Sequence, residues 1–450
     1  MRILRPIAVV FSTLWLAACG GGSDDEVSAT FPNAYVQMYN GSANSANTSL
    51  TLTLDTTDTP VGDAPFADVT NLVGVEGNTY KLKLTYKSDS TTTKTIKEDT
   101  VTLTNGEKTL LFMAGDFASP DLLKMNFVRD DTLDDQFKVS VMNLLNNATT
   151  YDVYIGDSTK TFTDAVLVGS AGYKTSTQFK NSAVGSYFIY VTKGGDRTVL
   201  FKSSAVAFSY ETEFVLVLRA AVGPQQNKLA VDLIGNTTTV LTQEDVNSSA
   251  QFRVYNSIND VNPGKIFLGD LTDTPAFANV AADTLTAYKE TVAGDYRVSL
   301  ADAQNNLVMR NGLVTLSQNS VKSIVFYRDA NANAAAITVA DSKLPQVFDF
   351  VFNAVNVIPN YNQVSLYFVA PGQTMETTPY YVNTLNYASQ TSVTLPAGEY
   401  TMFVVHKDTN NNKILLAQTE LKTLVTGSNY LLVAEPDAFS LSGYKLSLSK

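Results

Sequence analysis

The chain has 450 residues, of which 44% are apolar and 17% are charged, and its formal net charge is −11. This length and apolar content predict three or four domains at about 100 to 150 residues each. The acidic balance argues against nucleic acid as a partner, because such binding depends on cationic side chains that release counterions. Since charged residues are few, Thr, Asn, Ser and Gln must supply the polar surface, which favours strands and turns. We therefore expect an all-β protein.

The first 19 residues are typical of an export signal. Arg2 and Arg5 precede an apolar segment, residues 6–14, that is too short to span a bilayer. Leu-Ala-Ala-Cys at residues 16–19 then resembles the lipobox of bacterial lipoprotein signal peptides. The resemblance implies a diacylglyceryl group on the Cys19 sulfur, cleavage before Cys19, and acylation, for example by palmitate, of the new amino terminus. An ordinary signal peptide with a chance cysteine is the alternative.

Lipidation would anchor the chain stably, because several acyl chains together bind a membrane firmly, whereas one acyl chain alone binds it only marginally. Cys19 is the single cysteine of the chain, so no disulfide forms once it is acylated. Gly20 follows it in place of an aspartate, which in the sorting pattern of such lipoproteins favours the outer membrane. Whether the anchored chain faces the periplasm or the cell surface stays open. Residues 1–18 are thus predicted to be the signal peptide and residues 19–30 the lipidated cysteine with an acidic, flexible tether.

A glycine-tyrosine motif recurs four times and divides the rest of the chain. Its glycines are at positions 77, 185, 294 and 398, which are 108, 109 and 104 residues apart. In each copy we expect the glycine to allow a turn that a Cβ would strain, and the tyrosine to open a strand with one buried face. The spacing predicts one domain per repeat, at residues 31–131, 132–245, 246–345 and 346–450.

Alternating apolar residues predict a similar order of strands in each repeat. Thr57–Pro60 and Thr272–Pro275 share one sequence and are expected as a proline-bearing loop, and residues 242–245 as part of a polar junction. The predicted strands are 35–39, 50–54, 80–87, 96–103, 109–114 and 122–128 in the first repeat; 138–142, 151–157, 198–208, 213–219 and 228–233 in the second; 252–255, 265–270, 307–316, 322–328 and 336–339 in the third; and 350–357, 364–369, 414–421, 430–434 and 444–448 in the fourth.

Several short segments resemble a known bacterial family. Asp152–Asp157, Phe277–Val280 with Tyr288, and Ala293–Val298 follow one another as in the family called domain of unknown function 4397. The resemblance covers four copies and nearly the whole mature chain. It implies immunoglobulin-like sandwiches in an envelope or secreted protein, without a catalytic motif. We expect four tandem immunoglobulin-like β-sandwich domains of about seven strands, with the strand order left open. The Gly-x-Tyr turn resembles a tyrosine corner, in which the phenol bonds a nearby backbone group, but about three strands follow it here, whereas that corner lies near the penultimate strand.

Few residues are candidates for catalysis, and we expect no enzyme. His406 is the only histidine, and its phase with Tyr400, Met402 and Val404 places it at the edge of a core. Ser442 and Lys445 match a Ser-x-x-Lys pattern, but they belong to a terminal strand that cannot present both side chains on one face. A hydrolase with paired carboxylates remains an alternative, since no pair can be told from surface acids by sequence.

Cofactors are not expected, calcium excepted. Asp408, Asn410 and Asn412, and likewise Asp329, Asn331 and Asn333, place oxygen donors at alternate positions, as a calcium loop does. Neither segment has the glycine or the glutamate that complete such a loop. Hairpin turns also favour Asp and Asn for their geometry, so both interpretations stay open.

Exposed aromatic residues could bind sugar. Tyr361, Tyr380 and Tyr381 are the best candidates, and ordinary packing is the alternative. The leading hypothesis is a monomeric, non-enzymatic, lipid-anchored outer-membrane protein that acts as an adhesion, scaffold or interaction rod, with an unknown protein or glycan partner. The alternative is a lipoprotein that binds glycan or peptide for an outer-membrane uptake system.

Overall fold

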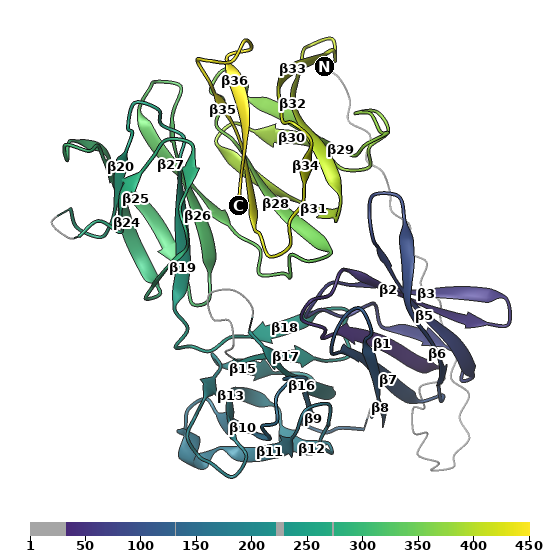
Figure 1. Cartoon of the computed structure of the whole chain (residues 1–450). Coiled ribbons are helices and arrows are strands. Elements are labelled where there is room, and N and C mark those ends of the chain that lie inside the picture. The colour runs from purple at the N-terminus through teal and green to yellow at the C-terminus, as the bar shows by residue number, and fades with distance from the viewer. Residues whose placement is uncertain (1–32, 131, 222–228, 272–273) are drawn as a thin grey trace, which may run out of the picture. The chain divides into compact units, whose positions relative to one another are not determined.

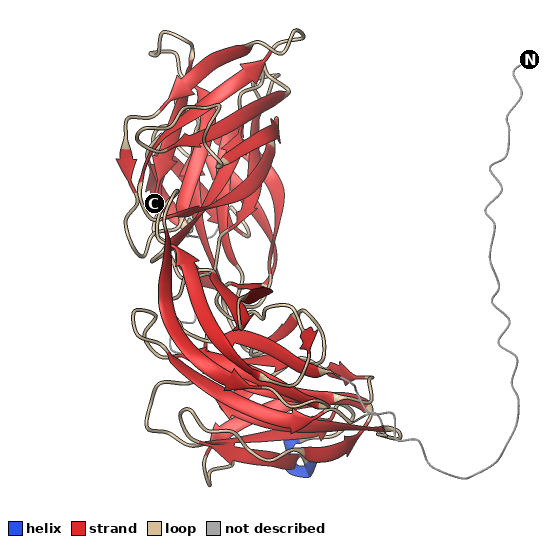
Figure 2. Cartoon of the chain, turned by 90° about the vertical axis from the view of Figure 1, so that its right-hand side faces the viewer, coloured by secondary structure: helices blue, strands red, loops and turns tan. Residues whose placement is uncertain are grey.

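Strands are the predominant secondary structure of the chain in the computed structural model, which describes residues 33–130, 132–221, 229–271 and 274–450. Within these residues there is one short 3₁₀ turn, η1 (Phe162–Asp164), and no longer helix (Figure 2). The strands make eight sheets that pack in pairs, and each pair encloses its own apolar core (Figure 1). The expectation of four tandem β-sandwich domains is therefore confirmed.

The first sandwich shows the arrangement that the other three repeat. One sheet has the strand order β4-β1-β7-β8 and the other has the order β3-β2-β5-β6. Strands β1 and β7 run parallel, with Tyr35 opposite Lys108 and Asn40 opposite Met113, whereas the other pairs are antiparallel. The strands are β1 (Ala34–Asn40), β2 (Thr48–Leu54), β3 (Thr57–Ala64), β4 (Val73–Val75), β5 (Thr79–Lys87), β6 (Thr93–Thr102), β7 (Glu107–Ala114) and β8 (Asp121–Val128).

The second sandwich has the sheets β12-β9-β16-β17-β18 and β11-β10-β13-β14, with β15 as a second partner of β13. Strand β9 pairs in parallel with β16. The strands are β9 (Gln136–Asn143), β10 (Tyr151–Asp157), β11 (Val166–Ala171), β12 (Lys180–Ala183), β13 (Gly185–Lys193), β14 (Phe201–Lys202), β15 (Val206–Phe208), β16 (Glu213–Ala220), β17 (Leu229–Ile234) and β18 (Val240–Gln243).

The third sandwich has the sheets β22-β19-β26-β27 and β21-β20-β24-β25, with β23 as a further partner of β19. Strand β19 pairs in parallel with β26. The strands are β19 (Ala250–Asn256), β20 (Gly264–Leu268), β21 (Phe277–Val280), β22 (Thr284–Leu285), β23 (Lys289–Thr291), β24 (Gly294–Ala301), β25 (Leu307–Leu316), β26 (Val321–Arg328) and β27 (Ala334–Ala340).

The fourth sandwich has the sheets β31-β28-β35-β36 and β30-β29-β32-β33, with β34 as a further partner of β32. Strand β28 pairs in parallel with β35. The strands are β28 (Asp349–Asn356), β29 (Gln363–Val369), β30 (Tyr381–Asn386), β31 (Ser389–Pro396), β32 (Glu399–Lys407), β33 (Lys413–Gln418), β34 (Lys422–Thr423), β35 (Tyr430–Pro436) and β36 (Tyr444–Ser449).

The first, third and fourth sandwiches each have eight strand positions and the second has nine, because β18 extends one of its sheets, whereas seven were expected. In all four the first strand pairs in parallel with a late strand, namely β1 with β7, β9 with β16, β19 with β26 and β28 with β35. This order differs from the ABED and CFG sheets of constant-type immunoglobulin domains, although the two-layer architecture is shared. The additional strands lie mostly at sheet edges, where they are short or polar. Their sequences consequently lack the apolar alternation that predicts strands.

Strand β3 corrects one prediction, because Thr57–Pro60 is part of an edge strand and not a loop. Pro60 pairs with Thr51 next to a shift in register, so the ladder of hydrogen bonds is already interrupted there. The missing N–H of the proline therefore breaks no continuous ladder. Residues 272–273 of the matching segment lie outside the described residues. Residues 240–243, which include part of an expected junction, are also strand, since β18 extends the sheet beyond β17.

The tyrosine of each repeat motif bonds its own chain four residues back, as expected of a tyrosine corner. The hydroxyls donate to the carbonyl oxygens of Glu76, Ala183, Val292 and Pro396 at 2.8, 2.7, 2.6 and 3.1 Å. Only at Gly398, with a φ of +154°, does the backbone itself favour glycine. In the second copy the reason is contact, because a Cβ on Gly185 would lie 3.3 Å from the Tyr187 ring. In the first copy a Cβ on Gly77 would lie 2.8 Å from Asn105 Oδ1, whereas on Gly294 it would make only ordinary contacts, so the expectation that a Cβ would strain the turn is wrong in the third copy.

A buried asparagine at the end of the first strand is a second repeated feature. Its side-chain oxygen accepts a hydrogen bond from the backbone N–H two residues on, and its amide donates to a carbonyl near the end of the third strand position, in the opposite sheet. Because the amide reaches from one sheet to the other, it fixes how the two layers meet. The four residues, all fully buried, are Asn40, Asn143, Asn256 and Asn356.

Candidate functional site

The first and second sandwiches meet through the outer faces of one sheet each. In strand β7 alternate residues point into the core of the first sandwich, while Leu110 and Phe112 point outward and are fully buried at this junction. They pack against Met142 of β9 and against Val215 and Val217 of β16. Each such apolar side chain contributes roughly 1.5–3 kcal/mol when it leaves water, so the junction is a second core between the sandwiches.

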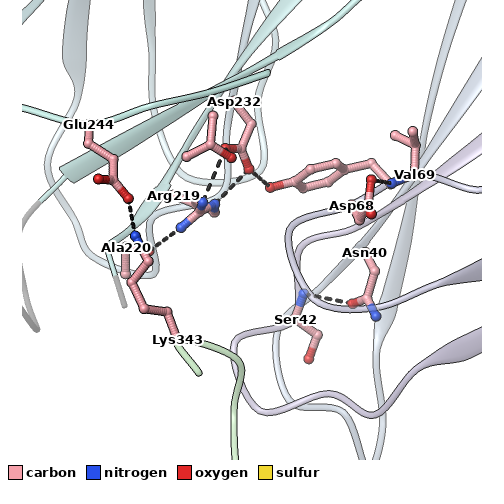
Figure 3. A network of polar contacts seen from close by, with 11 residues as sticks. Asn40, Ser42, Asp68, Val69, Arg219, Ala220, Asp232, Glu244 and Lys343 are labelled. Carbon is pink, nitrogen blue, oxygen red and sulfur yellow. Dashed lines mark hydrogen bonds and ion pairs between the residues drawn. The ribbon is translucent and has the colours of Figure 1, made fainter. Parts of the chain in front are cut away.

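A polar contact crosses the same junction (Figure 3). The Tyr39 hydroxyl of β1 donates to Asp232 Oδ2 of β17 at 2.5 Å. Arg219 of β16 binds the same carboxylate with two nitrogens, Nε to Oδ2 at 2.6 Å and Nη2 to Oδ1 at 3.1 Å, and the Thr242 hydroxyl donates to Oδ1 at 2.7 Å. Asp232 has no exposed surface. All of its acceptor capacity is used, which is what a buried carboxylate requires.

The pKa values of Tyr39 and Arg219 in this network are both raised. Burial, and then the neighbouring Asp232 carboxylate, raise the pKa of Tyr39 well above its usual value. Burial is the largest single influence on the pKa of Arg219 and lowers it, but the charges and hydrogen bonds of Asp232 and Tyr39 together outweigh burial and raise the pKa. A phenol and a guanidinium with raised pKa values do not exchange protons near neutral pH. The network is therefore suited to joining two domains and not to acid–base chemistry.

A hollow of about 450 Å³ opens beside the network, lined by Phe66, Asp68, Arg219, Glu244 and Lys343 among others. Its two cations are both engaged, since Arg219 binds Asp232 and lies 5.3 Å from the Phe66 ring centre, and Lys343 pairs with Glu244. Burial, and less strongly the proximity of Asp232, raise the pKa of Asp68. Since both cations are already paired, the hollow offers little to an anionic ligand.

The third and fourth sandwiches meet in the same manner. Val325 and Tyr327 of β26 pack against Val355 of β28 and Leu431 of β35. The Tyr255 hydroxyl donates to Glu435 Oε1 at 2.8 Å, which repeats the tyrosine–carboxylate contact of the first junction.

The acid at the second junction is also buried. The Ser447 hydroxyl donates to Glu435 Oε1 at 2.5 Å, whereas Glu435 Oε2 has no partner in the part of the chain that is described. Burial raises the pKa of Glu435. At both junctions, then, an odd-numbered sandwich supplies a tyrosine and the following sandwich supplies a carboxylate.

Sequence reasoning missed these junctions, although a signal is present. The junction tyrosines immediately precede the buried asparagines, as Tyr39-Asn40 and Tyr255-Asn256, whereas the second and fourth repeats have Met142 and Val355 at that position. Aligning the repeats on the asparagine would have shown a large residue at the preceding position, which faces away from the core and is expected to be polar. No local pattern, however, identifies the carboxylate that each tyrosine meets.

The proposed calcium loops are hairpin turns closed by their aspartates. Asp408 Oδ1 accepts the backbone N–H groups of Asn410 and Asn412, and Oδ2 accepts the Asn412 amide at 2.9 Å. Hydrogen bonds from Asn412 lower the pKa of Asp408. In the other loop Asp329 binds Asn331 and Asn333 through the same atoms, and Asp302 begins a third loop of this kind.

N–H donors therefore occupy the carboxylates that calcium would need, and the geometry supports the turn interpretation. No group of three or more His, Cys, Asp or Glu residues suited to a metal ion occurs among the residues that the structure describes. Calcium binding at these loops remains untested.

The candidate aromatic residues lie in different surroundings. Tyr380 packs against the fourth core, whereas Tyr381 is 48% exposed at the start of β30. Tyr361 contacts His406, with ring centres 4.5 Å apart. His406 itself lies at the end of β32, where Nδ1 is 3.3 Å from the Gln363 carbonyl oxygen.

Ser442 and Lys445 do not form a reactive pair. The Ser442 hydroxyl donates to the Tyr444 carbonyl oxygen at 3.2 Å. Lys445 instead binds Asp283 of the third sandwich at 2.5 Å. The Ser-x-x-Lys match thus has a structural explanation in which the two side chains have different partners.

Cys19 and the rest of the predicted signal peptide and tether lie outside the described residues. Among the residues that are described, none forms a helix of the length and hydrophobicity needed to cross a membrane. The lipid anchor accordingly stays a prediction from the lipobox.

Fold and junctions together define a protein of tandem β-sandwich domains joined in pairs. No family model and no curated protein matches the chain, so its resemblance to the family called domain of unknown function 4397 stays a prediction. Among solved structures the chain is similar to the Bacillus anthracis TIE protein, at 10% identity over 90% of this chain and 68% of that chain. The TM-score is 0.15, and a likeness this distant does not establish a shared fold or function.

Proposed function

We propose that the chain is a non-enzymatic, lipid-anchored protein of the bacterial outer membrane that acts as an adhesion, scaffold or interaction protein. The main support is the way in which the sandwiches are joined, with Tyr39–Asp232 at one buried junction and Tyr255–Glu435 at the other. Domains that share a large apolar interface do not move independently. Such pairs hold their loops at fixed positions, which suits contact with a partner at several points.

The anchor can be tested by changing Cys19 to Ser in the full chain. We expect the unchanged chain to fractionate with outer membranes and to incorporate labelled palmitate, because several acyl chains give stable anchoring. The Cys19→Ser chain should lose the label and leave the membrane fraction. Equal membrane association of both chains would argue against a lipid anchor.

The adhesion role can be tested in cells from which the chain is deleted. Outer-membrane vesicles from those cells should no longer retain a partner that vesicles with the intact chain retain. Restoring the intact chain should restore the partner, whereas the Cys19→Ser chain should not, because it is no longer held at the surface. If no partner differs and envelope properties are unchanged, the proposal loses its support.

The second candidate function is the binding of glycan or peptide for an outer-membrane uptake system. A specific observation favours it, namely two adjoining polar hollows on the fourth sandwich. Thermal unfolding with added ligands separates the two functions, because a ligand that binds only the folded chain raises the midpoint.

A further inference from the structure

The outer face of one sheet of the fourth sandwich carries an extended groove. Strand β29 points Leu366 and Phe368 into the core, and β30 and β32 likewise contribute Leu385 and Val404. The alternate residues of these strands face outward beneath two hollows of about 330 and 750 Å³. Asn383, Lys407 and Asn411 line both hollows, so the two are parts of one groove. Its size lies in the range of sites for small ligands.

The smaller hollow has an aromatic wall. Tyr367 and Tyr381 lie with their ring centres 6.2 Å apart and their planes inclined by 32°. Tyr367 is held in place, because Lys413 lies 4.7 Å from its ring centre and Met375 packs beside it, whereas Tyr381 is half exposed. An exposed ring on a rigid support offers a flat apolar surface with a polar tip, which matches the C–H face and the hydroxyls of a sugar ring.

The larger hollow has a rim of carboxamides. Asn362, Gln363, Asn383 and Asn411 all line it and are all exposed. In the described part of the chain no hydrogen bond holds their side-chain amides. Each amide offers two donors and an acceptor, so a row of them can satisfy adjacent hydroxyl groups, which both donate and accept.

The charges in the groove are few and nearly balanced. Lys413 pairs with Glu376 at 2.5 Å, which leaves Lys407 as the remaining cation of the lining. The apolar cluster on this face is small, and its main members Tyr367, Val369 and Val405 are already buried. A neutral, hydroxyl-rich ligand fits this lining better than an ionic one or an apolar peptide.

We propose that this groove, defined by Tyr367, Tyr381, Asn383 and Asn411, binds an oligosaccharide. Tyr381 stacks against a sugar ring, and the amides bind the hydroxyls of adjoining sugars. The inference deepens the second candidate function, on which it rests, because it names the ligand class of the same hollows; it does not depend on whether the chain is anchored.

The test uses the purified full chain with Cys19 changed to Ser and a panel of cello-, chito-, malto-, xylo- and manno-tetrasaccharides, followed by calorimetry. At least one tetrasaccharide should bind, with an affinity that does not fall when NaCl is raised. Tyr381→Ala and Asn383→Ala should each weaken binding about tenfold or more. Matched controls are Tyr210→Ala, at a tyrosine 75% exposed on the second sandwich, and Asn386→Ala, at an exposed residue of β30. Both controls should bind as the unchanged chain does.

Thermal midpoints of the four variants should match that of the unchanged chain, which shows that the fold is kept. If no tetrasaccharide binds, or if Tyr381→Ala and Asn383→Ala bind as well as the controls, the proposal is overturned. Binding that disappears when salt is added would also overturn the proposal, since it would show that the charge of Lys407 attracts the ligand. None of these outcomes depends on the anchor or on the cellular partner.

Discussion

The Tyr39 hydroxyl lies 2.5 Å from Asp232 Oδ2, although 193 residues separate the two along the chain. One belongs to the first sandwich and the other to the second, and neither side chain is exposed to solvent. The contact joins two folded units in the way that a core hydrogen bond joins two strands. It therefore predicts that the stability of one sandwich depends on a residue of the other.

Changing Tyr39 to Phe removes this hydrogen bond and keeps the ring that packs on Phe112. We expect the unfolding free energy to fall by about 2 kcal/mol, because the bond is made to a charged group that is then less well satisfied. Urea unfolding measures the loss. The control is Tyr210→Phe, at an exposed tyrosine, which should stay within about 0.5 kcal/mol of the unchanged chain. Equal effects of both changes would show that the junction adds no stability.

Lys108 should make stability depend on pH. It is buried at the first junction, where Nζ donates to the Gly235 carbonyl oxygen at 2.9 Å. Burial, and then the charge of Arg129, lower the pKa of Lys108 to about 7, while Glu213 acts in the opposite direction. Between pH 7 and about 10.5 the unfolded chain then holds a proton that the folded chain has released. Stability contributed at this residue therefore rises with pH across that window, by at most about 1.4 kcal/mol per pH unit.

Lys108→Met should remove this rise, because methionine carries no charge in either state. Urea unfolding at several pH values between 6 and 10 measures the slope. Lys81→Met, at an exposed lysine of β5, should leave the slope unchanged. A slope in Lys108→Met equal to that of the unchanged chain would show that Lys108 keeps its charge in the folded protein.

The buried asparagines predict a large effect of a small substitution. Asn256→Ala leaves the carbonyls of Val261 and Val280 and the N–H of Ile258 without their partner. We expect a loss on the order of 3 kcal/mol, since buried groups lose hydrogen bonds without gaining water. Asn386→Ala, at an exposed asparagine, should be nearly neutral. Differential scanning calorimetry distinguishes the two, and equal midpoints would mean that the asparagine does not join the sheets.

The aspartate loops predict that calcium has no effect on stability. Because backbone and amide N–H groups bind both Asp408 oxygens, millimolar Ca²⁺ should leave the thermal midpoint of the intact chain unchanged. Asp408→Ala should lower the thermal midpoint by the same amount with or without the ion, through loss of the turn hydrogen bonds. A rise in midpoint with Ca²⁺ that disappears in Asp408→Ala would instead support the calcium interpretation.

The sequence by itself determined the strands that have one buried face and the number of repeats. In β5, for instance, Tyr80, Leu82 and Leu84 alternate with exposed Lys81 and Lys83, so the pattern is visible along the chain. The tyrosine corners follow from the same local spacing, because each phenol bonds a group only four residues away.

Only the tertiary structure decided the strand order, the junctions and the groove. The parallel pairing of β1 with β7, and the contact of Tyr39 with Asp232, join residues that are far apart along the chain. No periodic pattern in the sequence indicates contacts of this kind. Tyr39 occupies an outward position in its strand, where local reasoning expects solvent, and it is buried because a second sandwich covers it. Tyr381 of β30 also points outward in its strand, but it stays half exposed. The alternation along a strand sets the direction of a side chain and does not show whether another domain covers it.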